Sequence, residues 1–369
     1  MKYYLVAGEA SGDLHGSNLM KGLAAQDSQA EFRFWGGDKM AAVGGTLVRH
    51  YKETAVMGFF EVISHLGKIG RNLSDCKTDI LSYNPDVVIL IDYPGFNFKI
   101  AEFAHRRGFK VFYYIAPKVW AWKERRIERL KNYVDRLFII FPFEVEYFRK
   151  KGVEAVYEGN PLIDAVKEGK SEAEFIESHS LDNRPTIALF AGSRKMEINF
   201  MMPRLLELEK ILGRDKYNFI LAGAPSIECE YYDKYLKNSA IKVVYGENYA
   251  IMRSAAAAVI NSGTASLEGA LVGVPQVVCY GFSPLSYLVA TLFVKVKYIS
   301  LANLILDKMI FKELVQNECT ADNIALELNN LLKNRPYRES MLQDYGRLRE
   351  VLGGRGASEK IARKMIESL

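Results

Sequence analysis

Short hydrophobic runs alternate with amphipathic stretches in two successive rounds along this chain. In the first round, runs typical of buried strands occupy residues 3–7, 32–36, 87–92, 111–115, 137–141 and 155–157. The alternation restarts with runs at residues 186–190, 219–222, 241–245, 256–260 and 276–280. Strands that alternate with helices build parallel sheets, so the pattern predicts an α/β protein with two doubly wound halves.

A charged, polar stretch at residues 166–184 separates the two rounds and runs into Pro185. Polar, turn-forming residues of this kind mark a connection between domains. We therefore expect an N-terminal domain over residues 1–165 and a C-terminal domain over residues 166–344. Residues 320–369 are charged and helical in pattern, with no strand signal.

The composition narrows the class of protein. Of 369 residues, 49% are hydrophobic and 25% charged, as in folded proteins, and a net charge of +5 excludes a polycation. Four dispersed cysteines without CxxC spacing favour free thiols in a reducing cytosol, and the five histidines show no metal-site pattern. No uncharged apolar run reaches the length of a membrane span, which predicts a soluble or peripheral protein.

A glycine turn follows the first strand of each half, and the two turns differ in charge. The first reads Gly8-Glu9-Ala10-Ser11-Gly12-Asp13 and the second Gly192-Ser193-Arg194. Carboxylates repel a pyrophosphate but grip sugar hydroxyls or take a proton, whereas an arginine fork suits a phosphate. We therefore expect an acceptor rich in hydroxyls in the N-terminal half and a phosphorylated donor in the C-terminal half. Helix capping is the alternative for Glu9 and Asp13.

A third turn, Asn261-Ser262-Gly263-Thr264, joins a buried strand to a helix. The unpaired N–H groups of a helix's first turn suit an anion such as a diphosphate. Glu268 lies one turn into this helix, where its carboxylate could accept hydrogen bonds from ribose hydroxyls. The alternative is an ordinary strand–helix turn with a glutamate that the helix dipole favours.

Asp92 comes at the end of an apolar strand. Partial burial there would raise the pKa of its carboxyl toward that of a useful general base. A turn-forming aspartate before proline is the alternative.

Two further segments combine aromatic or apolar side chains with positive charge. Trp120 and Trp122 precede Lys123 and Arg126, a mixture that suits single-stranded nucleic acid or a phosphorylated lipid; the alternative is a solvated basic helix with core tryptophans. Residues 55–73 are typical of an amphipathic helix in a membrane surface, or else of a buried core helix. Their apolar side chains include Met57, Phe59, Phe60, Ile63 and Leu66.

Taken together, these segments resemble lipid-A-disaccharide synthase, an inverting glycosyltransferase family of the two-Rossmann-domain (GT-B) class. Each motif alone is weak, but the ordered set is specific. The motifs are Gly8-Glu9-Ala10-Ser11-Gly12-Asp13, Met57-Gly58 with Glu61-Val62, Asp92-x-Pro94-x-Phe96-Asn97, Pro117-x-Val119-Trp120-Ala121-Trp122, Pro142-Phe143-Glu144, Gly192-Ser193-Arg194 with Glu197, Ser262-Gly263-Thr264-Ala265 with Leu267-Glu268, Ser300-Leu301-x-Asn303-Leu304 and Lys312-Glu313-Leu314-x-Gln316. Departures from the family pattern include Gly95 in place of Asp, and Gly159-Asn160 in place of Gly-His.

The resemblance implies a GT-B fold whose two Rossmann-like domains face each other across a cleft, with C-terminal helices at about residues 345–369 packing back on the N-terminal domain. It implies transfer from UDP-2,3-diacylglucosamine to 2,3-diacylglucosamine 1-phosphate (lipid X). The products are the β-1′,6-linked disaccharide 1-phosphate and UDP. Asp92 is then the first candidate for the base and Asp13 the second, with Glu9 beside them.

The resemblance also assigns the remaining site residues. The donor site comprises Gly192, Ser193, Arg194, Ser262, Gly263, Thr264, Glu268, Asn303, Glu313 and Gln316. The acceptor and membrane surface comprises Met57, Phe59, Phe60, Ile63, Leu66, Trp120, Trp122, Lys123 and Arg126. No metal, other cofactor or nucleic acid is expected. The expected location is cytoplasmic, peripheral on the inner membrane, and a homodimer is compatible with the family.

Two other classes of protein stay open. One is another two-domain UDP-sugar enzyme, of the UDP-GlcNAc 2-epimerase or peptidoglycan N-acetylglucosaminyltransferase type. The other is a non-enzymatic nucleic-acid binder that uses the tryptophan–arginine segment. Dependence on acyl chains separates the first class, because neither enzyme uses a diacylated sugar donor.

Overall fold

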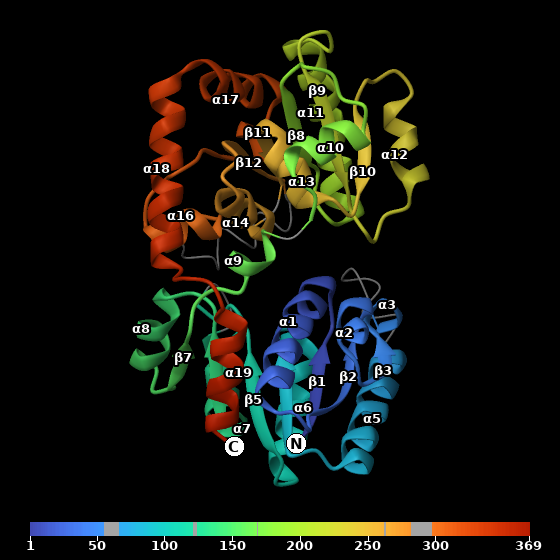
Figure 1. Cartoon of the computed structure of the whole chain (residues 1–369), viewed down its shortest axis with the longest axis vertical. Coiled ribbons are helices and arrows are strands. Elements are labelled where there is room, and N and C mark those ends of the chain that lie inside the picture. Colours follow the sequence, from blue (N-terminus) through green and yellow to red (C-terminus); the bar gives the residue numbers. More distant parts are fainter. Residues whose placement is uncertain (55–65, 121–123, 168, 262, 282–296) are drawn as a thin grey trace. The chain divides into compact units, whose positions relative to one another are not determined.

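The computed structural model describes residues 1–54, 66–120, 124–167, 169–261, 263–281 and 297–369 (Figure 1). Contacts divide the chain into two units, Met1–Pro161 with Gly353–Leu369, and Leu162–Leu352. The division falls after residues 161 and 352, whereas the sequence places it after residues 165 and 344.

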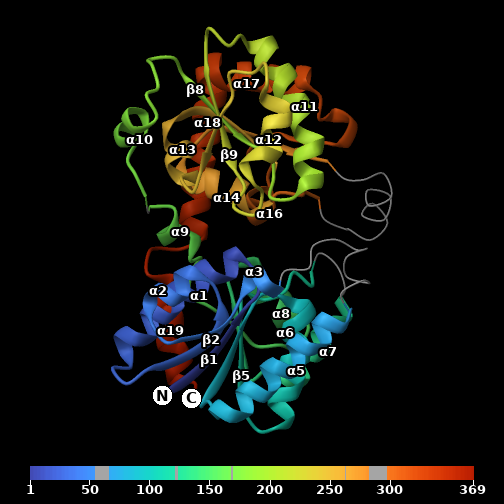
Figure 2. The same cartoon turned by 90° about the vertical axis from the view of Figure 1, so that its right-hand side faces the viewer.

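The N-terminal unit contains a seven-stranded parallel sheet in the order β3-β2-β1-β4-β5-β6-β7. Helices α1 and α19 lie on one face and α5, α6 and α7 on the other (Figure 2). The strands are β1 (Lys2–Ala7), β2 (Glu31–Gly36), β3 (Thr46–His50), β4 (Val87–Ile91), β5 (Lys110–Tyr114), β6 (Arg136–Ile139) and β7 (Ala155–Tyr157). The helices are α1 (Ala10–Gln26), α2 (Asp38–Val43), α3 (Tyr51–Thr54), α5 (Leu66–Tyr83), α6 (Pro94–Arg106), η1 (Glu124–Arg126), α7 (Ile127–Tyr133), α8 (Phe143–Lys150) and α19 (Ala357–Glu367).

The centre of this sheet explains where a site can form. Every residue of β4 is buried, as expected for an apolar strand covered by helices on both faces. Strands β1 and β4 pair in parallel up to Ala7 opposite Ile91, and the chain order reverses between them. Such a reversal is the topological switch point, outside which ligands bind at the carboxyl ends of strands. Glu9 and Asp92 therefore come from neighbouring turns at this point.

The C-terminal unit contains a six-stranded parallel sheet in the order β10-β9-β8-β11-β12-β13. Helices α11 and α17 lie on one face and α10, α13 and α14 on the other (Figure 2). The strands are β8 (Thr186–Phe190), β9 (Asn218–Gly223), β10 (Lys242–Tyr245), β11 (Ala255–Ile260), β12 (Gln276–Tyr280) and β13 (Glu313–Val315). The helices are α9 (Leu162–Ala165), α10 (Glu172–Ser178), α11 (Lys195–Leu212), α12 (Cys229–Leu236), α13 (Asn248–Ser254), α14 (Gly263–Val272), α16 (Leu301–Leu306), η2 (Gln316–Glu318), α17 (Ala321–Lys333) and α18 (Arg335–Val351).

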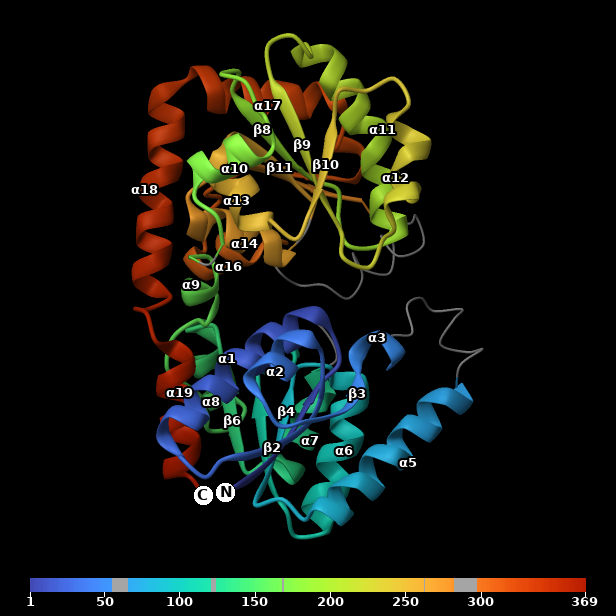
Figure 3. The same ribbon diagram turned by 45° about the vertical axis from the view of Figure 1, so that its right-hand side comes forward.

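The last helix, α19, returns to the N-terminal unit and packs on α1 (Figure 3). The contact is close because Gly22 has no side chain: a Cβ there would lie 3.0 Å from the Cβ of Ala362. The Gln26 side chain donates to the carbonyl of Glu359 at 3.0 Å, which ties the two helices together.

The predicted strands are all confirmed, and the structure adds β3 and β13. β3 has the mixed sequence TLVRH and β13 has three residues, and both lie at sheet edges. A short or half-polar edge strand carries little hydrophobic signal, which explains why the pattern missed them. The helical tail is confirmed as α17, α18 and α19. No described helix is long and apolar enough to cross a membrane.

Candidate active site

The turn after β1 and the turn after β4 touch at the switch point of the N-terminal sheet. Gly8 faces the ring of Tyr93, and a Cβ on Gly8 would lie 2.3 Å from that ring, so only glycine fits there. Glu9 is the N-cap residue of α1, but its exposed side chain makes no capping hydrogen bond. The two carboxyls also interact electrostatically: burial is the main cause of the raised pKa of Asp92, and the charge of Glu9 adds to the rise.

Asp92 is held in an unusual backbone conformation. Its φ is 45° and that of Tyr93 is 48°, a left-handed pair that costs free energy outside glycine. The carbonyl of Asp92 accepts hydrogen bonds from the Asn97 amide at 2.8 Å and the Tyr113 hydroxyl at 2.6 Å. These two buried side chains hold the turn in place and fix where the Asp92 side chain begins.

The carboxyl of Asp92 is half-buried and its proton affinity is raised. Burial raises the pKa of Asp92 to about 6, and Glu9 adds to the rise, whereas Lys118 lowers the pKa. A carboxyl with this pKa is ionised at neutral pH yet remains a better proton acceptor than an exposed aspartate. Asp92 thus has the properties of a general base.

Asp13, the second candidate for the base, binds backbone groups of the protein itself. Its carboxylate is 3% exposed and accepts from the N–H groups of Gly37 at 2.8 Å, Met40 at 3.0 Å and Lys39 at 3.1 Å. These N–H groups belong to the N-terminus of α2. Asp13 therefore caps a helix, as the alternative states, but the helix is α2 and not α1, which carries Asp13.

The second glycine turn, after β8, contains an internal ion pair. Arg194 pairs with Glu197 at 3.1 Å, and the arginine side chain is 59% exposed. The Glu197 carboxylate also accepts from the N–H groups of Ser193 at 2.7 Å and Arg194 at 3.2 Å. Gly192 has a φ of 108° and a Cβ there would lie 2.5 Å from Glu197. A carboxylate thus occupies the start of α11, and the exposed guanidinium is the group that can reach a phosphate.

The turn after β11 leads into α14, which begins at Gly263. Thr264 is exposed in the first turn of α14, and Ser262 lies outside the described residues. Glu268 is half-buried one turn later and accepts a hydrogen bond from the Tyr249 hydroxyl at 3.0 Å. Burial raises the pKa of Glu268 to about 7, and the Tyr249 bond lowers it.

Asn303 and Glu313 are brought together, but they bond to each other and to the backbone. The Asn303 amide donates to Glu313 at 2.8 Å and to the Phe311 carbonyl at 3.1 Å, and its oxygen accepts from the Ile310 N–H at 2.9 Å. Glu313 also accepts from the N–H groups of residues 299 and 300 at 2.9 Å each. These contacts anchor the segment before α16 to β13. Gln316 follows β13, with a left-handed φ of 54°.

Several expected acceptor and membrane residues lie outside the described residues: Met57, Phe59, Phe60, Ile63, Trp122 and Lys123. Leu66 begins α5, and nothing is described of its side chain. Arg126 is half-buried, with its guanidinium carbon 5.8 Å from the centre of the Phe98 ring. Trp120 is half-buried beside Phe143, with ring centres 5.1 Å apart.

Comparison with known proteins decides the family. A family model described as Lipid-A-disaccharide synthetase matches residues 3–364. The chain belongs to the lipid-A-disaccharide synthase family. The lipid-A-disaccharide synthase of Geobacter metallireducens is 40% identical over 99% of this chain and 96% of the relative. That of Geobacter sulfurreducens is 38% identical over the same shares. This family member is therefore a glycosyltransferase.

Solved structures of lower identity show the fold alone. The UDP-GlcNAc 2-epimerase from Neisseria meningitidis has a TM-score of 0.72 to this chain at 13% identity, with both chains covered in full. The glycosyltransferase of kitacinnamycin has a TM-score of 0.65 at 15% identity, covering 100% of this chain and 99% of that one. The lipid-A-disaccharide synthase family member thus has two Rossmann-like domains of the GT-B class. The family match favours a glycosyltransferase over the 2-epimerase and nucleic-acid alternatives.

Sequence reasoning about this lipid-A-disaccharide synthase family member left Glu144 without a role. Glu144 is the second residue of α8 and is 1% exposed. It accepts from the Trp120 indole at 3.0 Å and from the Phe141 N–H at 3.2 Å, and burial raises its pKa to about 7. The motif Pro142-Phe143-Glu144 is the available signal, because a glutamate within a few residues of the end of a buried strand is a candidate for a perturbed carboxyl.

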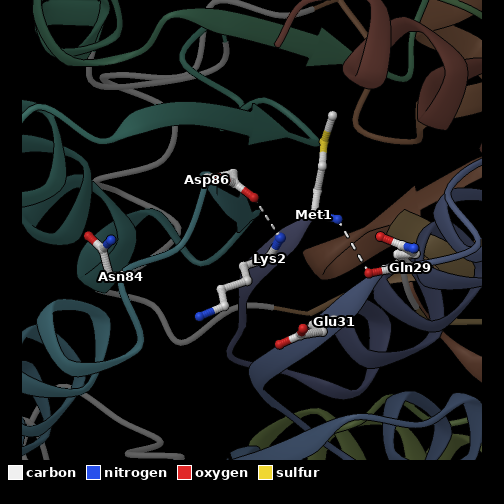
Figure 4. Close-up of a pocket in the computed structure, with 7 residues that line it drawn as sticks. Met1, Lys2, Gln29, Glu31, Asn84 and Asp86 are labelled. Atoms are coloured by element: carbon white, nitrogen blue, oxygen red, sulfur yellow. Dashed lines mark hydrogen bonds between the residues drawn. The ribbon is translucent and has the colours of Figure 1, made fainter.

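Among the described residues of this lipid-A-disaccharide synthase family member, no three His, Cys, Asp or Glu side chains gather as a metal site. A hollow of about 690 Å³ lies at the amino ends of β1 and β4 (Figure 4), the edge of the sheet opposite to Asp92. Its lining includes Met1, Lys2, Gln29, Glu31, Asn84 and Asp86.

Proposed function

We propose that this protein joins UDP-2,3-diacylglucosamine to 2,3-diacylglucosamine 1-phosphate, forming the β-1′,6-linked lipid A disaccharide 1-phosphate and UDP. The observation that carries the proposal is the family match, which extends over residues 3–364. The reaction needs a proton acceptor and a cation. The turn after β4 supplies the first in Asp92, and the turn after β8 supplies the second in Arg194.

Asp92 is the proposed base. As the 6-hydroxyl of the acceptor gives its proton to Asp92, the hydroxyl oxygen forms a bond to the anomeric carbon of the donor. The bond from that carbon to the diphosphate oxygen breaks, and UDP leaves with the electron pair, so the anomeric configuration inverts. The raised pKa of Asp92 supports this role, because a base works best with a pKa near the working pH. Glu9 is proposed to contact the acceptor substrate, since its carboxylate is exposed at the neighbouring turn after β1.

The proposed donor site lies in the C-terminal unit. The exposed guanidinium of Arg194 and the N–H groups at the start of α14, including Gly263 and Thr264, would neutralise the leaving diphosphate. Glu268 would accept hydrogen bonds from the ribose. Asn303 and Glu313 would act indirectly, by anchoring the segment before α16. With the charge supplied in this way, no metal or other cofactor enters the proposal.

Both substrates carry acyl chains, so we propose that the protein works at a membrane surface. The apolar residues between 57 and 66, with nearby basic groups, would contact the bilayer. The proposed location is the cytoplasmic face of the inner membrane, where the protein would be peripheral, and a homodimer is compatible with this arrangement.

The direct test is to mix purified protein with both lipid substrates in detergent micelles. We expect one UDP released for each disaccharide formed, as measured by mass spectrometry of the lipid and a coupled UDP assay. Replacing the acylated donor with UDP-N-acetylglucosamine should stop disaccharide formation. Conversion of UDP-N-acetylglucosamine without any acceptor would instead indicate the 2-epimerase alternative, and salt-dependent binding of single-stranded RNA would indicate the nucleic-acid alternative.

A further inference from the structure

A side chain from another helix reaches Glu268 of α14. Tyr249, on α13, donates its hydroxyl to Glu268 Oε1 at 3.0 Å. Helices α13 and α14 pack against each other on the same face of the C-terminal sheet. Tyr249 lies 19 residues before Glu268, so no motif around the glutamate identifies it.

Burial and Tyr249 are the two influences on the pKa of Glu268 within the described part of the chain. Burial raises the pKa to about 7, and the tyrosine bond lowers it by stabilising the ionised form. Two arginines on the helices packed against α14 donate to carbonyls instead: Arg253 to Val166 and Lys170, and Arg349 to Ala270 and Leu271. On α18, Arg335 pairs with Glu339 and Arg347 with Asp344. The other titratable groups on the described elements packed against α14 are Asp164 of α9, Cys279 and Tyr280 of β12, and, on α18, Arg335, Tyr337, Arg338, Glu339, Asp344, Tyr345, Arg347 and Glu350.

The protonation state of Glu268 matters for its assigned partner. Ribose hydroxyls are donors, and an ionised carboxylate accepts from them more strongly than a neutral carboxyl does. A neutral carboxyl also has a proton of its own that must find an acceptor. The sugar-nucleotide substrate therefore binds the fraction of the protein in which Glu268 is ionised, and its affinity falls in proportion when that fraction falls.

We propose that Tyr249 is a positioning residue for the sugar-nucleotide donor. Its hydroxyl orients the Glu268 carboxylate toward the ribose and favours the ionised form, so that donor binding is coupled to the loss of one proton from Glu268. This inference rests on the proposed function, in which Glu268 binds ribose.

The test uses isothermal titration calorimetry with UDP on the full chain, at several pH values. UDP itself titrates near pH 6, but this contribution is common to every variant and cancels in ratios of dissociation constants. The informative quantity is the dissociation constant of the wild type divided by that of Glu268→Gln at each pH. With a pKa of about 7, the ionised fraction drops about tenfold from pH 8 to pH 6, so this ratio should rise about tenfold.

Tyr249→Phe separates positioning from simple loss of structure. Removing the hydroxyl should move the pH midpoint of UDP binding upward, so affinity falls several-fold at pH 7 and recovers at higher pH. The matched control is Tyr245→Phe, because the Tyr245 hydroxyl bonds to the Ile227 carbonyl at 3.3 Å instead. That control should leave the pH midpoint unchanged.

The outcomes distinguish this inference from the function beneath it. A ratio that stays flat from pH 6 to pH 8 would overturn the proton coupling. A Tyr249→Phe defect of equal size at every pH would show a structural role and overturn the positioning claim. If UDP binds the wild type and Glu268→Gln equally well at high pH, the assignment of Glu268 to the ribose is wrong. Absence of UDP binding by the wild type at any pH would contradict the proposed function itself.

Discussion

The indole nitrogen of Trp120 donates to Glu144 Oε1 at 3.0 Å and so ties the loop after β5 to the start of α8. This loop has a strained beginning, because Ile115 is β-branched and has a left-handed φ of 65°. It also carries Lys118, whose charge acts on the carboxyls of both Asp92 and Glu144. The Trp120–Glu144 bond thus fixes a strained loop that brings a cation near the proposed base.

Trp120→Phe should disturb this loop more than an ordinary loss of ring volume. The variant removes the indole donor and leaves the buried Glu144 with one hydrogen bond fewer, a cost of about 1–3 kcal/mol. The matched control is Trp35→Phe, because the buried Trp35 nitrogen has no hydrogen-bond partner among the described residues. The melting temperature measured by calorimetry and the turnover should both fall further for Trp120→Phe than for Trp35→Phe. Equal losses in the two variants would mean that the hydrogen bond contributes nothing.

Asp92→Asn keeps the shape of the side chain and removes the proton acceptor. Turnover should drop about 10²-fold or more, with little change in UDP affinity. In the wild type the base must be ionised, so activity should fall as the pH drops below about 6, the raised pKa of Asp92. Steady-state rates across pH, with UDP binding measured in parallel, check both statements. Near-normal turnover of the asparagine variant would transfer the role of base to Asp13.

Arg194→Ala tests the donor site. Loss of an exposed guanidinium that contacts the diphosphate should weaken UDP binding about tenfold or more, because hydrogen bonds to charged groups contribute about 1.5–3 kcal/mol. Binding of lipid X should persist, since the acceptor is assigned to the other unit. Arg335→Ala is the control, because that side chain is 87% exposed and pairs only with Glu339 among the described residues. Unchanged UDP affinity for both Arg194→Ala and Glu268→Ala would place the donor elsewhere.

The sequence predicts elements better than it predicts which side chains meet. Buried parallel strands such as β4 are continuous apolar runs, and that signal needs no knowledge of neighbours. Asp13 shows the limit, because its partners Gly37 and Met40 are 24 and 27 residues away and arrive through the pairing of β1 with β2. The motifs identify Asn303 and Glu313 as site candidates, but they do not predict the hydrogen bond between the two side chains.

The membrane surface stays a prediction, because residues 55–65 lie outside the described part of the chain. Replacing Phe59, Ile63 and Leu66 with Ser should reduce binding to anionic vesicles and raise solubility without detergent, while the protein stays folded. Vesicle sedimentation and circular dichroism measure the two quantities. If the triple variant unfolds instead, these side chains belong to the core and the alternative of a buried helix is correct.

Asp13→Asn decides between a structural and a chemical role for the second carboxylate at this edge. In the structure, Asp13 accepts three backbone N–H bonds from the start of α2, and an asparagine would turn an amide donor toward one of those N–H groups. We therefore expect a loss of about 1–3 kcal/mol in the free energy of unfolding, with turnover falling only modestly in the protein that remains folded. The control is Asp38→Asn, because that carboxylate belongs to the first turn of α2 and is 80% exposed. An unchanged melting temperature combined with a loss of turnover like that of Asp92→Asn would assign the base to Asp13, since a purely structural carboxylate cannot affect the rate without affecting the fold.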